Sequence, residues 1–377
     1  MFDKLFKKHA ESLLAEAGIC IKGARPFDIL VGDQRLYRRV FMERSLGLGE
    51  AYMDGWWECE DLAQFFARIF ETHPAISYGG LRGFVLQFLM KLFNMQSIKL
   101  SRRVAQKHYS LGNDLYASML GETMAYTCAY YGKGAQTLDE AQRDKFRLVC
   151  RKLDLRKGQH VLDIGCGWGG FAKLAAEEFG VRVTAVNITD EQLEFSREKY
   201  WGLPVEFFNC DWRQIQSLPT KVYDHVVSIG MLEHVGPRHF VKLMKIVESV
   251  MKENGLFLLH SIVHRGFVDP WMEKYIFPGG VAPAMKQIIR SFKGILSIVD
   301  VHNFGADYAR TLHAWHENFE RAWPGLRATG KYDERFRRMW RYYLLSCEGA
   351  YLARQRLQLC QFVLSKGGAP GTYRPVR

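Results

Sequence analysis

The chain lacks the marks of several large protein classes. Its eight cysteines form no C-x-x-C pair, no C-x3-C-x2-C spacing of radical enzymes and no Cys/His set at zinc-finger spacing. We therefore predict no metal site and a reduced, cytosolic setting. Acidic residues are also in the minority, with 40 Asp and Glu against 52 Lys and Arg, which gives a formal net charge of +12. An extended partner is then expected to be polyanionic, either nucleic acid or an anionic membrane.

Long apolar runs are missing as well. No window approaches the roughly 20 uncharged apolar residues that span a bilayer, and the first 18 residues alternate Lys with Phe and Leu. We therefore expect a protein that is neither exported nor membrane-spanning. Repeats and low-complexity segments are absent too, and the 48% share of hydrophobic residues suits one large core or two unequal ones.

What is present is a long alternation of strand-like and helix-like segments. Residues 1–95 mix short strand-like pieces with amphipathic helices and are expected to form a smaller N-terminal α+β domain. Residues 96–377 are expected to form the catalytic domain, with a helical lid or substrate segment at 96–140, a core sheet at 141–305, and helices plus a final strand at 306–377. Strands are predicted in QHVLDIG, VRVTAVNIT, PVEFFNCDW, YDHVVSIGML, GLFLLHSIV, LSIVDVHNF and LQLCQFVLSK. Such a pattern predicts an α/β fold with a doubly wound, mostly parallel sheet of about seven strands, covered on both faces.

The exit loop of the first predicted strand is rich in glycine. It reads DIGCGWGG over residues 163–170, so Asp163 stands two residues before Gly165, which is followed by Gly167. Glycines let the backbone turn sharply and approach a ligand, and this position is the usual ligand site of a doubly wound sheet. A carboxylate there is unsuited to pyrophosphate and suited to a cationic ligand. The loop resembles motif I of the class I methyltransferases that use S-adenosylmethionine; a nicotinamide nucleotide or a purely structural turn are the alternatives.

Two further pairs of residues are candidates for holding the nucleoside. The second strand ends without the acidic residue that commonly binds the ribose hydroxyls, so Asn187 and Gln192 are assigned that task. Asp211 and Trp212 follow the third strand, where the acid could accept from an adenine amine and the indole could stack on the ring. Taken alone, Trp212 also fits a core aromatic.

Several dense motifs occur in one order along the chain. They are HYSLGNDLY, MAYTCAYY, VLDIGCGWGG, GMLEHVGP, LLHSI, DPWMEKYIFPGG and HNFGADYARTLHAW. In this order they resemble the cyclopropane-fatty-acyl-phospholipid synthases. Upstream, SLGLGEAYMDGWWE resembles the N-terminal domain of the bacterial phospholipid enzymes, so the resemblance covers nearly the whole chain.

The resemblance implies a reaction and a site. Members of that family transfer a methyl group from S-adenosylmethionine to a cis double bond of a phospholipid acyl chain, and then remove a proton to close a cyclopropane ring. Bicarbonate is the implied base, held by residues that match Cys128, Glu233, His260, the backbone of Ile262, and Tyr308 here. The implied cofactor contacts are Tyr126, Thr127, Asp163, Gly165, Gly167, Asn187, Gln192, Asp211 and Trp212. Thr127 and Asn187 depart from the family's usual Ser and Thr, but both keep a polar group.

The residues suit that chemistry. Alkylating an alkene leaves a carbocation that water would capture, so the site should be dry, aromatic and supplied with one base. The matching segments contain Tyr126, Tyr130, Tyr131, Trp271, Tyr275, Phe277, Phe304 and Tyr308; individually, each also fits core packing. Cys347 matches a cysteine proposed in the family as a nucleophile. Because an alkene attacks a sulfonium methyl without a covalent intermediate, we instead expect Cys347 to be a buried packing residue.

A phospholipid substrate calls for contact with a membrane. The apolar stripe of residues 81–95 and its basic flanks suit an interfacial helix, although such a stripe equally suits packing on the catalytic domain. Phe2, Leu5 and Phe6, with Lys4, Lys7 and Lys8, form a second candidate. We expect a peripheral protein on the inner face of the cell membrane, and the resemblance implies a homodimer. One rival interpretation is another S-adenosylmethionine-dependent methyltransferase, which acts on an amine or a soluble metabolite or methylates the alkene without closing a ring. A second is a basic membrane or nucleic-acid binding protein. Because no RNA-binding module is recognisable, no nucleic-acid partner is predicted.

Overall fold

The computed structural model describes residues 2–73, 111–264, 269–353, 357–368, 371 and 373–377. These residues form two compact units. The first lies within Met1–Met95, Phe267–Gly280 and Tyr308–Gln358, and the second within Gln96–Gly266, Val281–Asp307 and Leu359–Arg377. The predicted interfacial helix at 81–95 lies outside the described residues.

The first unit is mainly helical. Its helices are α1 (Phe2–Glu16), α2 (Arg35–Glu43), α3 (Ser45–Met53), α4 (Leu62–Thr72), α12 (Pro270–Tyr275), α14 (Ala306–Ala328, which begins two residues before the unit) and α15 (Glu334–Leu352), and its one hairpin pairs β1 (Ile29–Val31) with β2 (Trp57–Cys59). Helix α15 packs closely on α4. Gly349 permits this approach, because a Cβ at that position would lie 2.6 Å from the Ala63 carbonyl oxygen.

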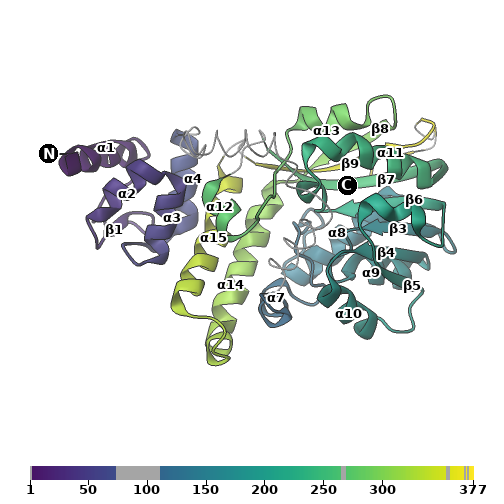
Figure 1. Ribbon diagram of the computed structural model, residues 1–377, viewed down its shortest axis with the longest axis horizontal. Coiled ribbons are helices and arrows are strands. Elements are labelled where there is room, and N and C mark those ends of the chain that lie inside the picture. Colours follow the sequence, from purple (N-terminus) through teal and green to yellow (C-terminus); the bar gives the residue numbers. More distant parts are fainter. Residues whose placement is uncertain (1, 74–110, 265–268, 354–356, 369–370, 372) are drawn as a thin grey trace. The chain divides into compact units, whose positions relative to one another are not determined.

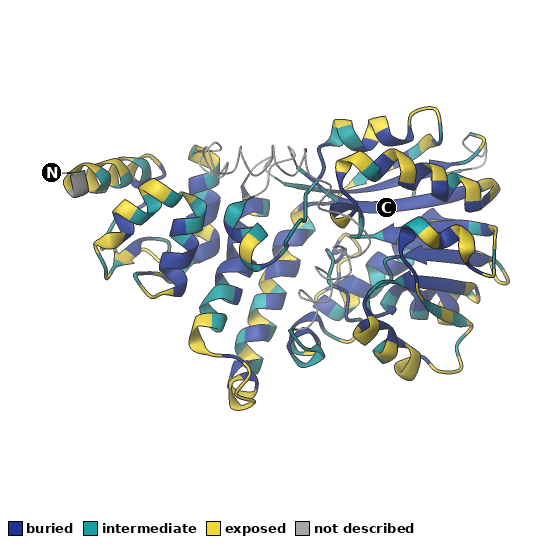
Figure 2. Ribbon diagram, in the orientation of Figure 1, coloured by how far each residue is buried: buried dark blue, intermediate teal, exposed yellow. Residues whose placement is uncertain are grey.

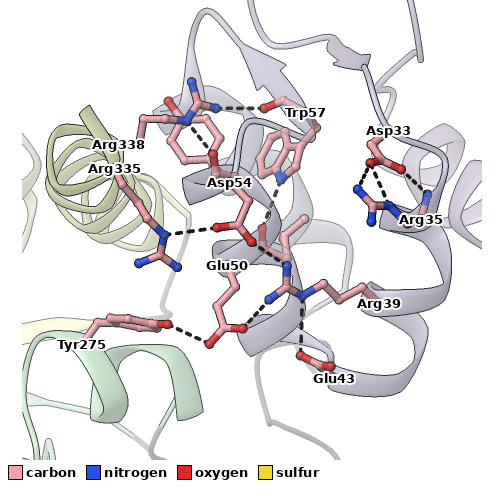
Figure 3. Close-up of polar contacts among 12 residues, drawn as sticks. Asp33, Arg35, Arg39, Glu43, Glu50, Asp54, Trp57, Tyr275, Arg335 and Arg338 are labelled. Atoms are coloured by element: carbon pink, nitrogen blue, oxygen red, sulfur yellow. Dashed lines mark hydrogen bonds and ion pairs between the residues drawn. The ribbon is translucent and has the colours of Figure 1, made fainter. Parts of the chain in front are cut away.

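A buried ion-pair network joins α12 to α3 within this unit. Glu50 of α3 accepts hydrogen bonds from Tyr275 Oη of α12 (2.8 Å) and from Arg39 of α2 (Figure 3). It also accepts from Lys274 Nζ of α12 (2.5 Å). These donors lower the pKa of the Glu50 carboxyl, although burial alone would raise it. Residues 267–280 and 308–358 thus pack with the N-terminal segment, whereas the sequence analysis placed them in the catalytic domain. The reason is that α12 and α15 find their polar and apolar partners on α3 and α4.

The second unit contains the seven-stranded sheet (Figure 1). Its strands are β3 (His160–Ile164), β4 (Arg182–Asn187), β5 (Val205–Asn209), β6 (Tyr223–Ile229), β7 (Met251–Val263), β8 (Ser297–Asn303) and β9 (Gln358–Ser365). Their order is β5-β4-β3-β6-β7-β9-β8; β3 to β7 pair in parallel, and β8 is antiparallel to β9. The predicted fold class and all seven predicted strands are confirmed.

Helices cover both faces of this sheet, because alternate strand residues point to opposite sides. On one face Leu162 and Ile164 pack with α11 (Phe240–Val250) and α13 (Met285–Phe292). On the other face Val161 packs with α8 (Leu138–Lys152) and α9 (Gly170–Phe179). Figure 2 shows the resulting pattern, with strands dark blue and the outer sides of the helices yellow.

Shorter elements complete the second unit. They are α7 (Asn113–Leu120), α10 (Asp190–Lys199), η2 (Trp212–Ser217), η3 (Leu232–His234) and η4 (Pro237–His239). Helix α11 ends at Val250, and Met251 takes an extended conformation that begins β7. Among the described residues, no helix combines the length and the hydropathy that crossing a bilayer requires.

Candidate active site

The glycine-rich loop lies at the point where the strand order reverses. Strand β3 is flanked by β4 on one side and β6 on the other, so the loop after β3 opens at the topological switch point of the sheet. Gly165 and Gly167 have φ of 82° and 55°, values that residues with a Cβ rarely adopt. Moreover, a Cβ on Gly165 would lie 2.8 Å from Met231. The loop therefore needs glycine here both for its turn and for its close approach to the residue after β6.

Asp163 presents a buried carboxylate oxygen beside this loop. The residue is only 2% exposed, and its Oδ2 atom has no hydrogen-bond partner among the described residues. Burial raises the pKa of this carboxyl to about 7. An unpartnered buried carboxylate is costly, so the arrangement favours a ligand that brings a cation or a hydrogen-bond donor. The amino and sulfonium groups of S-adenosylmethionine meet that requirement.

Asn187 and Gln192 come together at the end of β4. Asn187 Nδ2 donates to Gln192 Oε1 (2.7 Å) and to the carbonyl oxygen of Gly167 (3.3 Å). Because its Oε1 accepts from Asn187, the orientation of the Gln192 amide is fixed. Its Nε2 is buried and has no acceptor in the described part of the chain. The pair thus offers a fixed donor next to the glycine-rich loop, which fits the predicted contact with ribose hydroxyls.

Asp211 is bound by a neighbouring arginine. Arg213 donates to Asp211 Oδ1 from its backbone (2.9 Å) and Nε (2.6 Å), and to Oδ2 from Nη2 (2.7 Å), so Asp211 caps η2. The Arg213 guanidinium also lies 5.4 Å from the Trp212 ring centroid. A carboxylate has about four acceptor positions, so Asp211 can accept from an adenine amine while it stays bonded to Arg213. The contact with adenine stays a prediction.

The segment 125–128 packs against the end of β6 and the glycine-rich loop. The ring of Tyr126 lies 5.4 Å from that of Tyr116, which in turn lies 5.1 Å from Trp168 in the loop. Gly230, directly after β6, leaves room for Thr127, because a Cβ there would lie 2.5 Å from Thr127 Cγ2. Thr127 therefore borders the end of β6, and Tyr126 is linked to the glycine-rich loop through Tyr116.

Glu233 and His260 are buried polar residues near the end of β7, and we refer to them together as the second pocket. Glu233 Oε1 accepts from Ile262 N (2.6 Å) and Ser261 Oγ (3.1 Å), the two residues after His260. Its other oxygen, Oε2, is buried without a partner among the described residues, and burial raises the pKa of the carboxyl. The backbone N–H of Ile262, expected to bind an anion directly, is thus bonded to Glu233.

The imidazole of His260 has one ring nitrogen, Nε2, without a partner among the described residues. Gln361 Nε2 lies 3.3 Å from Nδ1; in the tautomer in which Nδ1 accepts from it, the ring proton is on Nε2, which has no acceptor in the described structure. Burial and the charges of Lys145 and Lys152 hold the pKa of His260 well below its usual value. Phe304 lies 5.8 Å from the imidazole ring and 5.3 Å from Tyr130, which gives this pocket an aromatic wall.

The remaining predicted catalytic residues have different surroundings. Cys128 is fully buried, and its thiol donates to the Ala129 carbonyl oxygen (3.1 Å). Tyr308 and Cys347 belong to the first unit, where the Tyr308 ring stacks 4.6 Å from Tyr351. Cys347 is partly exposed rather than fully buried. Desolvation and the charge of Asp269 raise the pKa of the Cys347 thiol to about 12, so it is not a thiolate at neutral pH.

The aromatic residues that the sequence analysis grouped fall into two sets. Tyr130 and Phe304 line the pocket of His260. Trp271 and Phe277 belong to the first unit, where their rings contact Tyr342 and Tyr343 respectively.

Sequence reasoning missed two polar residues of α8. Lys145 is fully buried, and its Nζ donates to Thr127 Oγ1 (2.7 Å) and Gln142 Oε1 (2.6 Å). Their spacing contained a signal. Residue 145 stands four positions after Ala141 and four before Val149, on the apolar stripe of its helix. A lysine is rarely buried on such a stripe unless its ammonium group has a partner or a function.

Comparison with known proteins places the chain in a family. The family model for mycolic acid cyclopropane synthetase matches residues 96–362. The cyclopropane-fatty-acyl-phospholipid synthase of Escherichia coli K12 is 43% identical over 371 residues, covering 95% of this chain and 93% of that protein. The chain belongs to the cyclopropane synthase family. The tuberculostearic acid methyltransferase UfaA1 of Mycobacterium tuberculosis is 32% identical and covers 89% of this chain and 82% of its own length.

Solved structures of cyclopropane synthases share the fold. CmaA1, solved with SAH and CTAB, matches with a TM-score of 0.64 at 26% identity, covering 70% of this chain and 98% of CmaA1. MmaA2 of Mycobacterium tuberculosis matches with a TM-score of 0.63 at 25% identity, again covering 70% and 98%. The sheet of the second unit is therefore the sheet of an S-adenosylmethionine-dependent methyltransferase.

Proposed function

We propose that this cyclopropane synthase relative methylates a cis double bond in the acyl chain of a membrane phospholipid and then closes a cyclopropane ring. The observation that carries the proposal is the occurrence, in one unit, of two pockets with unpartnered buried atoms. Asp163 Oδ2 stands beside the glycine-rich loop, while Glu233 Oε2 and His260 Nε2 mark the second pocket. The relation to the E. coli synthase over nearly its full length supports the phospholipid as substrate.

In the first pocket, the chain's own residues bind and orient the methyl donor. S-adenosylmethionine supplies an electrophilic methyl group on a sulfonium. Asp163 accepts from or faces the positive end of the methionine moiety, and Gln192 donates to the ribose. Tyr126 and Thr127 close the pocket from the other side. These contacts fix the direction in which the methyl group points. Binding energy then offsets the entropy that orienting the reactants costs, which lowers the activation barrier.

In the second pocket, the residues hold the proton acceptor and exclude water. Bicarbonate supplies a general base for the transferred methyl group. In this proposal His260 Nε2–H donates to the anion, and Glu233 Oε2 accepts from the anion's hydroxyl. Cys128, in the same unit, is a further member of the set that the family resemblance implies; Tyr308 of the first unit stays a prediction. Tyr130 and Phe304 offer π faces that stabilise a carbocation without capturing it.

The bonds balance in this scheme. The alkene π electrons form a bond to the methyl carbon as its bond to sulfur breaks. The C–H electrons of the same methyl then close the ring as its proton leaves. The test is mass spectrometry of phospholipid vesicles, with cis-unsaturated or fully saturated chains, after incubation with the protein and S-adenosylmethionine. A mass gain of one CH2 group on unsaturated chains alone, with loss of double-bond reactivity, is expected; no gain on either lipid would contradict the proposal.

A second outcome has some support among the relatives. UfaA1 of Mycobacterium tuberculosis and a protein of Pseudomonas putida, 37% identical over 258 residues, are named as a methyltransferase of tuberculostearic acid and a probable fatty acid methyltransferase. Their names raise the alternative of a methyl branch without ring closure. The same experiment separates the two, because a methylene branch would add one CH2 group and keep a reactive double bond.

We also propose a peripheral position on the inner face of the cell membrane, through α1 and α2. Leu5 is 61% exposed and Met42 66% exposed, which is unusual for residues of this size. Phe6 of α1 stacks on Phe41 of α2 at 4.4 Å, so these apolar residues lie on neighbouring helices. Exposed Lys4 and Lys8 flank them. Apolar side chains framed by lysines suit the interface of an anionic bilayer. The cytoplasmic setting and the homodimer stay predictions, the latter open to light scattering of the purified protein.

A further inference from the structure

We propose that Lys145 is a positioning residue that supplies the buried positive charge against which an anionic base binds near His260 and Glu233. The inference rests on the proposed function, because it concerns the base of that reaction. Neither the sequence motifs nor the comparisons assign a role to this residue. It lies on α8, whose buried Phe146, Val149 and Cys150 belong to the core.

The surroundings of Lys145 contain no counter-charge. Its Nζ is held by two neutral oxygens, Thr127 Oγ1 and Gln142 Oε1, and no carboxylate of the described chain lies within ion-pair distance. Lys152, on the same helix and equally buried, differs in this respect because Asp300 Oδ2 lies 3.5 Å from its Nζ. An ammonium taken from water without a counter-ion is costly. We infer that the counter-ion of this ammonium is an anion that binds together with the substrates.

The hydroxyl that accepts from Lys145 Nζ belongs to Thr127, the residue before Cys128, which is a predicted contact of the base. The Cys128 thiol, from segment 125–128, interacts with Lys145 and favours its charged form. The charge of Lys145 in turn disfavours protonation of His260 on β7, as does that of Lys152. Burial lowers the pKa of Lys145 to about 7, so the charge is only marginally stable before an anion is present. Anion binding would restore it.

The charge is also needed to balance Glu233. An anion bound beside the Glu233 carboxylate would be repelled if that carboxylate is ionised, in a region where few solvent dipoles screen the repulsion. A fixed ammonium offsets this repulsion. It also allows His260 to remain neutral, so that its Nε2–H donates to the anion without giving up its proton.

The anchoring of Lys145 links this charge to the cofactor side. Gln142 Nε2 donates to the carbonyl oxygens of Thr127 (2.9 Å) and Ala125 (3.3 Å), while its Oε1 accepts from Lys145. One network therefore holds the backbone of Ala125 and Thr127 and the position of Nζ. Between and beside them stand Tyr126, a predicted cofactor contact, and Cys128, a predicted contact of the base.

The experiment compares Lys145→Met with Lys152→Met, which removes an equally buried lysine from the same helix. Asp300 keeps its bidentate contact with Arg377 in the control (2.7 Å for both bonds). Binding of bicarbonate is measured without turnover, as the rise in unfolding temperature on adding bicarbonate at constant ionic strength in the presence of S-adenosylhomocysteine. The bicarbonate dependence of product formation is measured in parallel.

We expect Lys145→Met to raise the bicarbonate concentration for half-saturation by about tenfold or more in both measurements, because a charge-assisted contact is lost. Because Lys145 also donates to Thr127, a predicted cofactor contact, affinity for S-adenosylhomocysteine should fall too, but by less than the affinity for bicarbonate. Lys152→Met should leave the bicarbonate dependence within about twofold of the wild type. If Lys145→Met does not fold, Lys145→Gln takes its place, since an amide still donates to Thr127 without the charge.

Other results would overturn the inference. A folded Lys145 variant with wild-type bicarbonate half-saturation would remove the role of Lys145 and leave the proposed reaction standing. An equal loss in both lysine variants would show a general effect of buried charge rather than a specific one. Wild-type protein that forms the ring without binding bicarbonate would overturn both the base and this inference, whereas wild-type protein that forms no ring at all would overturn the proposed function itself.

Discussion

At the scale of single residues, Glu233 carries the most specific part of the proposed reaction. Its Oε1 is used by Ile262 N and Ser261 Oγ, so only Oε2 is left for chemistry. Glu233→Gln keeps an oxygen for those two donors and places an NH2 group where Oε2 stood. We expect ring formation to fall by about 10²-fold or more, because the acceptor has become a donor. Mass spectrometry of the lipid product measures this; binding of S-adenosylhomocysteine should be unchanged, and an unchanged product yield would contradict the assignment.

Asp163 gives a prediction about pH. Because burial raises the pKa of the free carboxyl to about 7, part of the protein holds a neutral Asp163 near neutral pH. A cationic ligand prefers the ionised form, so binding releases a proton and affinity rises with pH. From pH 6 to pH 8 the affinity for S-adenosylmethionine should increase about tenfold. Calorimetric titration measures the effect. Asp163→Asn should bind more weakly and lose most of the dependence; an equally steep dependence in the variant would assign it to another group.

At the scale of elements, the strands of the second unit were predictable because each is a short apolar run bounded by glycine or polar residues. The helices of the first unit were predictable as helices but not as members of that unit. Their partners are set by contacts far apart in sequence, such as Gly349 against Ala63 and Glu50 against Tyr275. The glycine-rich loop and Asp163 were visible in one short motif. Lys145 was not, because its role depends on Thr127, 18 residues away, whose hydroxyl it meets only in the folded chain.

Glycine at position 49 tests how tightly α3 packs within the first unit. A Cβ on Gly49 would overlap the indole ring of Trp271, a fully buried side chain of α12 that cannot move aside cheaply. Gly49→Ala should therefore destabilise the protein by about 1–3 kcal/mol, although alanine favours a helix. Gly325 of α14 is the matched control, since a Cβ there meets nothing within 4 Å. Gly325→Ala should stabilise by about 0.5–1 kcal/mol. Urea unfolding measures both, and equal signs would contradict the packing argument.

At the scale of the whole molecule, the net charge of +12 has two possible uses. Spread evenly, it would attract any anionic surface with no preferred face. Concentrated beside exposed apolar side chains, it would select one face for a membrane. On α1 and α2, Lys4 and Lys8 accompany the exposed Leu5 and Met42, so we expect the second arrangement on these helices. The two cases differ in which lysines matter.

Two double variants of equal net charge decide between these cases. Lys4→Gln with Lys8→Gln changes the proposed membrane face, and Lys242→Gln with Lys245→Gln changes exposed lysines of α11 in the sheet unit. Each lysine near an anionic surface contributes about 1 kcal/mol, so the first pair should weaken binding to anionic vesicles roughly 30-fold, and the second only slightly. Sedimentation of vesicles with and without phosphatidylglycerol measures both. Equal losses in the two pairs would show that the charge acts without a preferred face, and Leu5→Ser then separates the apolar part, since it should weaken binding at every salt concentration whereas the lysine effect fades as salt rises.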